Sequence, residues 1–248
     1  MCGRFTITTA PERWVDLLQV SDWPDGFTSR FNIAPTQNIA CVTEAKGRRS
    51  AQMMKWGLVP SWAKDVKIGV RMINARSETA AEKPSFRTAL KKRRCLIPAD
   101  GFFEWEKIDS KTKQPWLIHY RDHTPFAFAA LWESWVPPMP DIATSNIATT
   151  SITTTSITTV APVFSCSILT TQSNSEMAEI HDRMPVVIQP QQYSAWLSSS
   201  ASPGQVQQLM NPVADGSWNR FRVNRLVGNV KNDVPECIQP LEQSDRLF

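Results

Sequence analysis

The sequence lacks any run of about 18 consecutive apolar residues, the length that a membrane-spanning helix requires. Its first residues, Met-Cys-Gly-Arg-Phe-Thr, also lack the apolar core and the small-residue cleavage site of a secretory signal. We therefore expect no membrane association and a cytoplasmic location, associated with the nucleoid if the protein is bacterial.

Metal-ligating residues are scarce as well. The chain has three histidines and five cysteines, and no two cysteines form a C-x-x-C pair. This composition argues against a structural zinc site, and an odd number of cysteines in an intracellular chain argues against a disulfide framework. We expect no metal, no cofactor, and inert buried thiols at every cysteine except Cys2, namely at Cys41, Cys95, Cys166 and Cys237.

The excess of positive charge is small. A net charge of +4 over 248 residues permits a nucleic-acid partner but does not require one. The basic residues gather in a run at 91–94 and in a looser group formed by Arg220, Arg222 and Arg225. Taken alone, each group is typical of a solvated face.

The order of the expected elements favours an α+β fold. We expect helices over 9–20 with Thr9 as cap, from Pro84 onward, and over 191–197 and 202–210. Strands are expected within 30–60, over 115–132 as two strands around a turn at Asp122–Pro125, over 163–170, and around Phe221 and Val223. Because the order lacks regular βαβ alternation, we expect one domain with a mainly antiparallel, barrel-like sheet flanked by short helices.

One segment differs in composition from the rest. Residues 143–160 are rich in Ser, Thr and Ile, and the unit Ser-Ile-Thr-Thr recurs at 151–154 and 156–159. Such a segment cannot bury a core of its own. We interpret it as an insertion between two strands, either extended or forming a projecting hairpin.

Cys2 is the most reactive candidate in the chain. Removal of Met1 would leave a free α-amine and a thiol on one residue. Such an aminothiol condenses with an aldehyde to an imine, and the thiol then closes a five-membered thiazolidine. Both groups titrate near neutral pH, at about 7.7–8.0 and about 8.5, so each has a reactive fraction. Arg4 would favour the thiolate, but position alone also fits an ordinary cysteine.

Four other segments carry polar side chains in suggestive positions. Asn74 and Arg76 alternate, so on a strand they share a face, and His181 and Arg183 do the same if extended. Glu104 precedes Trp105, and two tryptophans, at 56 and 62, flank a Gly-Leu-Val-Pro stretch. Taken singly, each fits an ordinary structural residue, since tryptophans are more often core and isolated carboxylates are usually solvated.

Taken together, the segments resemble the SOS response-associated peptidase family, whose members act as abasic-site processing proteins. The resemblance spans residues 2–240 as one domain and is interrupted by the 143–160 insertion. It rests on segments that stand in the family's order: Met-Cys-Gly-Arg-Phe at the start, 32–37, 56–62, 74–78, 93–105 and 181–185.

The resemblance implies a covalent activity. Cys2 matches the nucleophile that forms a thiazolidine with the opened sugar of an abasic site in single-stranded DNA. Asn74 matches the amide that holds this sugar. Glu104 and His181 match the groups that move protons in ring opening, a role to which both side chains are suited.

The resemblance also implies a DNA-binding set. Arg76 and Arg183 match arginines that hold flanking phosphates, which the guanidinium fork suits well. Arg4, Trp56 and Trp105 match positions that line the DNA groove, where tryptophan can stack on any base.

Three functions remain open at this point. The first is a monomeric enzyme that crosslinks to abasic sites through Cys2, with an associated strand-cleaving lyase activity; its partners at the replication fork cannot be predicted. The second is a thiol peptidase, foremost one that removes its own Met1. The third is a non-covalent binder of single-stranded DNA, which a terminal aminothiol would not serve.

Overall fold

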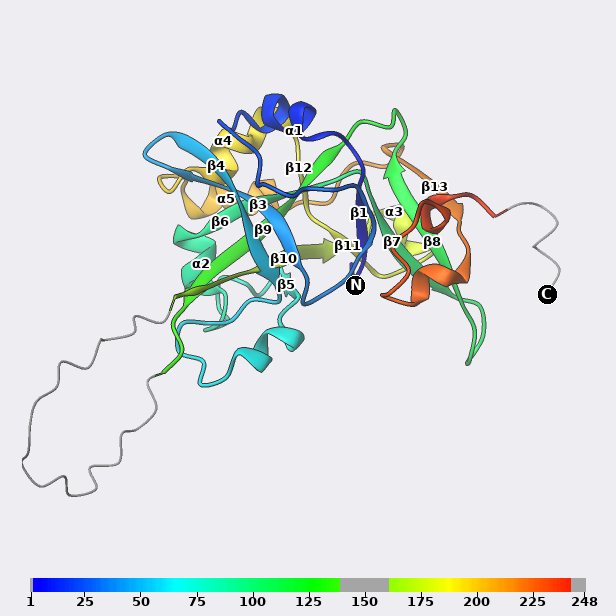
Figure 1. Ribbon diagram of the computed structural model, residues 1–248, viewed down its shortest axis with the longest axis horizontal. Helices are drawn as coiled ribbons and strands as arrows, with labels where there is room; N and C mark the ends of the chain where they lie inside the picture. Colours follow the sequence, from blue (N-terminus) through cyan, green and yellow to red (C-terminus); the bar gives the residue numbers. More distant parts are fainter. Residues whose placement is uncertain (1, 139–160, 242–248) are drawn as a thin grey trace, which may run out of the picture.

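A computed structural model describes residues 2–138 and 161–241 (Figure 1). The predicted insertion at 143–160 lies outside the described residues, so that interpretation stays a prediction. Among the helices of the described part, none is long and apolar enough to cross a membrane.

One of the two sheets is entirely antiparallel and carries the N-terminal strand. Its strands, in spatial order, are β13 (Trp218–Arg222), β8 (Lys113–Tyr120), β7 (Gly101–Lys107), β1 (Phe5–Ile7) and β2 (Arg30–Ile33). All three residues of β1 are buried. This burial fixes the start of the chain inside the molecule, beside β7.

The other sheet closes on itself. Its strands are β11 (Arg183–Pro185), β10 (Val163–Gln172), β4 (Arg48–Trp56), β3 (Asn38–Ala45), β6 (Arg94–Ala99), β9 (Phe126–Trp135), β12 (Val187–Ile188) and β5 (Asn74–Arg76). Strand β10 pairs with β4, and the chain of pairs through β3, β6 and β9 returns to β10. Among the strands that the structure describes in this sheet, β10 pairs in parallel with β4 and β5, and the other strand pairs are antiparallel. The prediction of an α+β fold with a mainly antiparallel, barrel-like core is confirmed.

Aromatic side chains join the two sheets. Phe128 of β9 packs edge-on against Phe5 of β1 and Phe102 of β7, with ring centroids 5.7 and 6.2 Å apart. All three rings are buried. Edge-to-face pairs of this kind add about 0.5–1.5 kcal/mol each beyond the burial of apolar area. The first strand is therefore anchored from the barrel side as well as by its own sheet.

Short helices lie around the sheets. The α-helices are α1 (Pro11–Leu18), α2 (Arg87–Lys92), α3 (Ser175–Ala178), α4 (Tyr193–Leu197) and α5 (Pro203–Leu209). The 3₁₀ turns are η1 (Val66–Arg71), η2 (Pro190–Gln192), η3 (Arg225–Gly228) and η4 (Pro235–Ile238). The prediction for 202–210 is confirmed, including Ser202 as cap in a reciprocal capping box with Gln205.

Two local predictions were wrong. Thr9 does not cap the first helix: its hydroxyl donates to Asp100 at 2.5 Å, and α1 begins after Ala10 with Pro11 in its first turn. A carboxylate that is distant in sequence, between β6 and β7, competes with the local cap. The second helix begins at Arg87 rather than at Pro84, which lies in the preceding turns.

The basic run at 91–94 is not a uniformly solvated face. Arg94 is 5% exposed, and its guanidinium donates to backbone carbonyls of Leu90, Trp196 and Ser198. Arg93 pairs with Glu133 at 2.6 Å. Only Lys91 and Lys92 are exposed. The two arginines fasten α2 to its neighbours and are not available to a polyanion.

Candidate functional site

The N-terminal segment enters the molecule alongside β7. The backbone N–H of Phe103 donates to the carbonyl of Arg4 at 3.0 Å, which continues the pairing of β1 and β7 toward the chain start. Cys2 is fully buried. In Figure 1 the N-terminus lies among the labels of β5, β7 and β11, the strands that carry Asn74, Glu104 and Arg183.

Asn74 holds the backbone of Cys2. Its side-chain N–H donates to the Cys2 carbonyl at 2.9 Å. Its Oδ1 is buried and has no hydrogen-bond partner within the described part of the chain. A buried acceptor without a partner is costly, and a ligand with a donor group would satisfy it. The site thus contains an acceptor that is ready for a hydroxyl or an amine.

Strand β5 presents Asn74 and Arg76 as the sequence predicted. Ala75 between them is buried, whereas Asn74 is half-buried and Arg76 is exposed, so the two polar residues share a face. The strand runs parallel to β10, with Asn74 opposite Ile168 and Arg76 opposite Thr170. Arg76 is therefore an accessible cation close to the Cys2 backbone.

Glu104 is a buried carboxyl beside Cys2. It lies on β7 and is 1% exposed. Burial raises the pKa of Glu104 from its ordinary value to about 7. Burial also raises the pKa of the Cys2 thiol, and the charge of Glu104 raises it further. At neutral pH the thiol is protonated and Glu104 is poised between its two forms.

His181 follows α3 and faces the same region. Its backbone N–H donates to the carbonyl of Met177 at 2.9 Å, and the Asn174 side chain caps the helix, so the turn is held at both ends. Nδ1 accepts from the backbone N–H of Arg183 at 3.0 Å, which leaves the proton of a neutral ring on Nε2. Burial lowers the pKa of His181. The neutral form therefore prevails at pH 7.

Asp182 was not assigned a role from the sequence. Its carboxylate lies 2.8 Å from Nδ1 of His181. If the ring becomes charged, Nδ1 carries a proton and can donate a hydrogen bond to this carboxylate. Its charge also raises the pKa of Glu104. Glu104 and the His181 segment are thus close enough to interact electrostatically.

Arg183 is bound by a carboxylate that the sequence analysis passed over. Its two terminal nitrogens donate to the two oxygens of Glu78 at 2.7 and 2.9 Å, and Nη2 also donates to the carbonyl of Thr170. This hydrogen bonding lowers the pKa of Glu78. The pair ties the segment after β5 to the start of β11. Glu78 stands inside the 74–78 motif, and only the fold reveals its partner.

Arg4 is also engaged within the protein. Its guanidinium donates to Asn32 at 2.8 Å and to the carbonyls of Val227 and Gly228 at 2.6 and 3.1 Å. It lies 6.0 Å from the ring centroid of Trp105, a cation–π contact. Arg4 therefore fastens the N-terminal strand to η3 and supports Trp105, which is half-buried.

The two tryptophans at 56 and 62 have different environments. Trp56 is fully buried, donates its indole N–H to the carbonyl of Ile73 at 2.9 Å, and packs against Phe5. It offers no open face, so its predicted place in a DNA groove is corrected: Trp56 is a core residue that fixes the start of β5. Trp62, to which the family resemblance assigned no role, is 56% exposed.

A close backbone contact shapes the loop that carries Trp62. Gly57 has a φ of 132°, and a Cβ at this position would meet the carbonyl oxygen of Gly69 at 2.6 Å. Only glycine fits such a conformation and such an approach. The loop from 57 to 73 is thus folded tightly and returns the chain to Asn74.

The described residues contain no group of three or more His, Cys, Asp or Glu side chains that could hold a metal ion. The site instead combines a terminal cysteine, an amide, a buried carboxyl and an imidazole. Such a set supports nucleophilic attack on a carbonyl with proton transfer by neighbouring groups.

Comparison with known proteins provides independent evidence on the family of this chain. A model of a family described as SOS response associated peptidase matches residues 1–230. The chain is 37% identical over 242 residues to the abasic site processing protein YoqW of Bacillus subtilis, covering 96% of this chain and 99% of that protein. It is 29% identical to the abasic site processing protein YedK of Escherichia coli, covering 97% and 100%.

A solved structure shares the fold. A protein from Bacteroides thetaiotaomicron superposes with a TM-score of 0.80 at 22% identity, covering 97% of this chain and 100% of that one. At this identity the likeness concerns the fold alone.

Proposed function

The chain belongs to the SOS response associated peptidase family, and from this premise we propose that it processes abasic sites in single-stranded DNA. In this proposal Cys2, freed by removal of Met1, forms a covalent thiazolidine with the opened deoxyribose. The relatives from Bacillus subtilis and Escherichia coli are both named abasic site processing proteins. The resulting crosslink would shield the lesion during the response to DNA damage.

The reaction balances without a cofactor. The α-amine of Cys2 attacks the aldehyde carbon of the opened sugar, and loss of one water gives an imine. The sulfur then adds to the imine carbon, and the thiol proton passes to the nitrogen. Aldehyde and aminothiol thus yield a thiazolidine and one water, with no change of oxidation state.

Glu104 is the group that moves protons at the nitrogen and the sulfur. Because its pKa is about 7, it both donates and accepts at neutral pH, which is the condition for efficient general acid–base catalysis. The Cys2 thiol, whose pKa is raised by burial, needs such an acceptor before it can attack. Nε2–H of His181 donates to an oxygen of the sugar.

Asn74 orients the nucleophile. Its hydrogen bond to the Cys2 carbonyl restricts the rotation that would turn the amine and thiol away from the sugar. Its unpaired Oδ1 accepts from the sugar hydroxyl or from the amine. The observation that carries the proposal is this contact: an amide predicted to act at the site binds Cys2 itself, with a buried carboxyl beside it.

In this proposal, DNA binding relies on fewer residues than the family resemblance implies. Arg76 is exposed and has no side-chain hydrogen bond within the described residues, so it is the arginine that contacts a flanking phosphate. Arg183, already held by Glu78, contacts a phosphate only by sharing its remaining N–H groups. Trp105 and Trp62 offer stacking faces for unpaired bases.

Among the described contacts, the hydrogen bond of Asn74 favours the crosslink over self-cleavage. The side-chain N–H of Asn74 donates to the carbonyl of Cys2. This carbonyl belongs to the peptide bond after Cys2, whereas release of Met1 requires cleavage of the bond before Cys2. An oxyanion hole for that cleavage requires donors on the carbonyl of Met1 instead. We therefore propose the crosslink as the main activity.

Intact mass spectrometry of the purified protein, before and after incubation with a single-stranded abasic oligonucleotide, tests the proposal. We expect loss of Met1, and then an adduct with the mass of protein plus DNA minus one water. A thiol peptidase would instead turn over a peptide without DNA. A non-covalent binder would show no adduct under denaturing conditions and equal affinity for intact and abasic strands, and either result would overturn the proposal.

A further inference from the structure

The hairpin between β7 and β8 carries an unneutralised group of cations. Lys107, Lys111, Lys113 and, from the adjoining η3 turn, Arg225 are all exposed. No ion pair involves any of the four within the part of the chain that the structure describes. We call these four residues the hairpin cations.

The acidic residues of the hairpin are occupied by other contacts. Asp109 at the tip accepts from the backbone N–H groups of Lys111 and Thr112, both at 2.7 Å, and so closes the turn. Glu106 accepts from the indole N–H of Trp116 at 2.9 Å. Neither carboxylate forms an ion pair with a hairpin cation, although Arg225 lies near enough to Asp109 to interact weakly. The group therefore keeps most of its positive charge.

The placement of two lysines works against stability. Lys107 and Lys113 stand directly opposite each other in the antiparallel register. Like charges at opposed positions destabilise a strand pair. Folding alone would favour an opposite charge or a neutral residue at one of these positions. A bound anion would relieve the repulsion between the two lysines.

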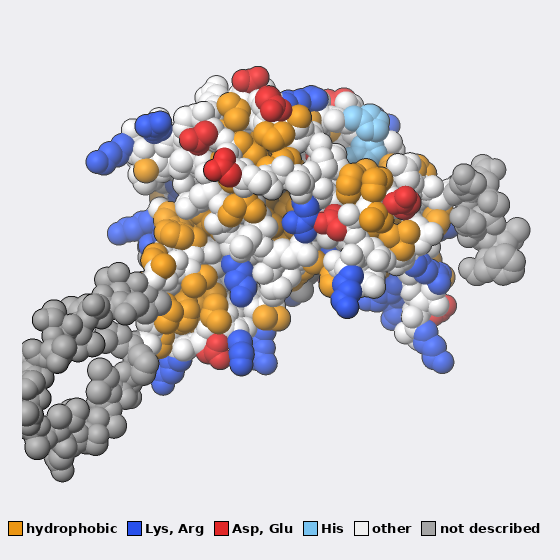
Figure 2. All heavy atoms as spheres, in the orientation of Figure 1, with side chains coloured by type: hydrophobic (Ala, Val, Ile, Leu, Met, Phe, Trp, Pro, Cys, Tyr) orange, Lys and Arg blue, Asp and Glu red, His pale blue; other side chains and the backbone are white. Residues whose placement is uncertain are grey.

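The hairpin continues the site outward. Trp105 and Lys107 alternate on β7 and share one face, whereas Glu104 lies on the opposite face, three residues or about 10 Å along the strand from Lys107. Burial lowers the pKa of His181 and the charge of Lys113 lowers it further, so the hairpin lies within electrostatic range of the site. In Figure 1 the hairpin extends below the N-terminus, and Figure 2 shows basic side chains along this lower edge of the molecule. A strand that delivers an abasic sugar to Cys2 therefore passes the hairpin as it leaves.

We propose that the β7–β8 hairpin binds the sugar–phosphate backbone of the DNA on one side of the lesion. The inference rests on the proposed function, and it adds a polarity: one flank lies along Trp105 and the hairpin cations, and the other flank does not. The contacts are to phosphates, since lysines on an exposed hairpin attract a polyanion without reading its bases.

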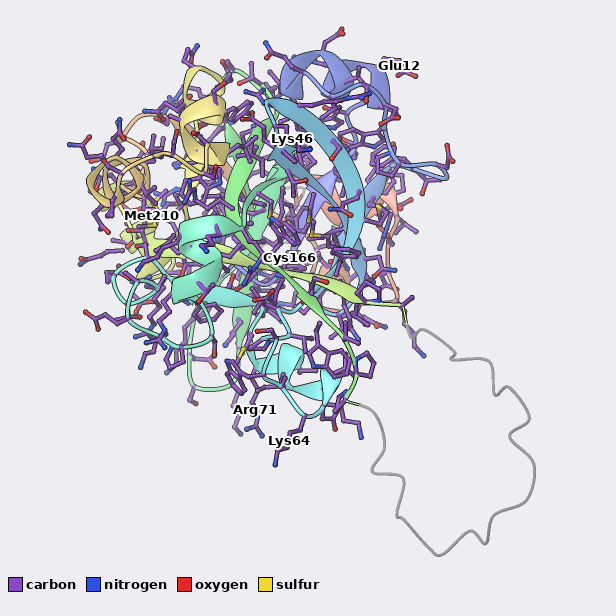
Figure 3. The ribbon with its side chains drawn as sticks, turned by 90° about the vertical axis from the view of Figure 1, so that its left-hand side faces the viewer. Glu12, Lys46, Lys64, Arg71, Cys166 and Met210 are labelled. Carbon is purple, nitrogen blue, oxygen red and sulfur yellow. The ribbon has the colours of Figure 1, made fainter. Side chains whose placement is uncertain are left out.

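The test measures the affinity for single strands that carry a tetrahydrofuran abasic analogue, which has no aldehyde and cannot be crosslinked. The analogue is placed near the 5′ end or near the 3′ end, so that only one flank is long. The variant is Lys107→Gln with Lys113→Gln. The control is Lys46→Gln with Arg48→Gln on the β3–β4 hairpin, where two exposed cations lie far above the site (Lys46 in Figure 3).

We expect the β7–β8 variant to weaken binding about tenfold for one placement only, and to lower the slope of log affinity against log salt by about 1.4, the value for two lost contacts on a single strand. The control variant should bind like the native chain. The proposal would be overturned if the affinity fell equally for both placements or did not fall. It would also be overturned if the affinity fell by the same factor in the control variant. Because the analogue is unreactive, a native chain that fails to crosslink refutes the proposed function while leaving this result valid.

Discussion

The buried thiols of this protein occupy two different environments. Cys41, Cys95 and Cys166 lie on three strands of the closed barrel, near enough to hydrogen-bond to one another. Figure 3 places Cys166 in the interior of the molecule. Cys2 lies at the N-terminus between β5 and β7, and it is just as fully buried.

Burial alone does not distinguish the two environments. In both of them it raises the pKa of the thiol, so neither is reactive by virtue of its own acidity. The difference lies in the neighbours. Cys166 donates to the carbonyl of Lys55 at 3.6 Å and otherwise lies among thiols, whereas Cys2 has a carboxyl with a pKa of about 7 and an amide on its backbone. Reactivity therefore depends on adjacent groups that accept protons and fix geometry.

The largest expected effect comes from removing the thiol that we propose as the nucleophile. Cys2→Ala should abolish the stable crosslink to abasic single strands, because an imine without a neighbouring thiol hydrolyses. The measurement is a denaturing gel after incubation with an abasic oligonucleotide. Cys166→Ala, which removes a thiol of equal burial, should crosslink like the native chain. An undiminished stable crosslink in Cys2→Ala would refute the thiazolidine.

Glu104→Gln should slow crosslinking by about 10²–10⁴-fold, the usual contribution of a well-placed general acid–base group. The amide keeps the size of the side chain but cannot exchange a proton. The comparison is between single-turnover rates at saturating DNA, with affinity for the unreactive analogue measured in parallel. If affinity fell as much as the rate, Glu104 would be a binding residue.

The same variant should change how stability depends on pH. The pKa of Glu104 is raised on folding, from an ordinary 4.5 to about 7, so the native state binds more protons than the unfolded state between these values. The contribution of Glu104 to the free energy of unfolding is fully present below pH 4.5. This contribution, about 3 kcal/mol, is lost as pH rises through 7. Chemical denaturation at pH 5 and pH 8 should show this fall in the native chain and a smaller one in Glu104→Gln.

Asn74→Ala should slow crosslinking about fivefold, since it removes one hydrogen bond to the Cys2 backbone, worth about 1 kcal/mol. Asn74→Asp is the matched variant, because it keeps the acceptor oxygens and loses the N–H donor. If the donor to Cys2 is what matters, both variants are slow. A normal rate in Asn74→Asp would assign the role to Oδ1 alone.

A substitution of a barrel thiol should have the smallest effect on crosslinking. Its effect on the free energy of unfolding should still be measurable. Cys166→Ala leaves a small cavity among packed strands and should lower the unfolding free energy by about 2 kcal/mol. Urea titration at pH 7 measures it. An unchanged stability together with impaired crosslinking would mean that the barrel thiols contribute to the chemistry, against the comparison drawn above.

Local sequence patterns predicted several elements well. The apolar run over 163–170 became β10, and the Ser202 capping box formed as expected. The alternation of Asn74 and Arg76 correctly placed both on one face. These features depend on strand period and on contacts within a few residues, which the sequence contains directly.

Long-range contacts explain where the predictions failed. Thr9 could not be known to bond with Asp100, nor Arg94 to be enclosed by carbonyls of α4 and its flank, since the partners are distant in sequence. Trp56 and Trp62 look alike in their motif, yet one is buried and the other is exposed. Burial is a property of the assembled sheets, and no local pattern determines it.

For function, the sequence by itself indicated the family through its motifs, and it singled out Cys2 as the proposed nucleophile, because a cysteine that follows the initiator methionine becomes an aminothiol in any fold once Met1 is removed. The tertiary structure alone decided that Asn74 binds the Cys2 backbone, that Glu78 holds Arg183, and that burial moves the pKa of Glu104 to about 7. These properties arise from solvent exclusion and from contacts between distant segments, and such contacts exist only once the two sheets have packed.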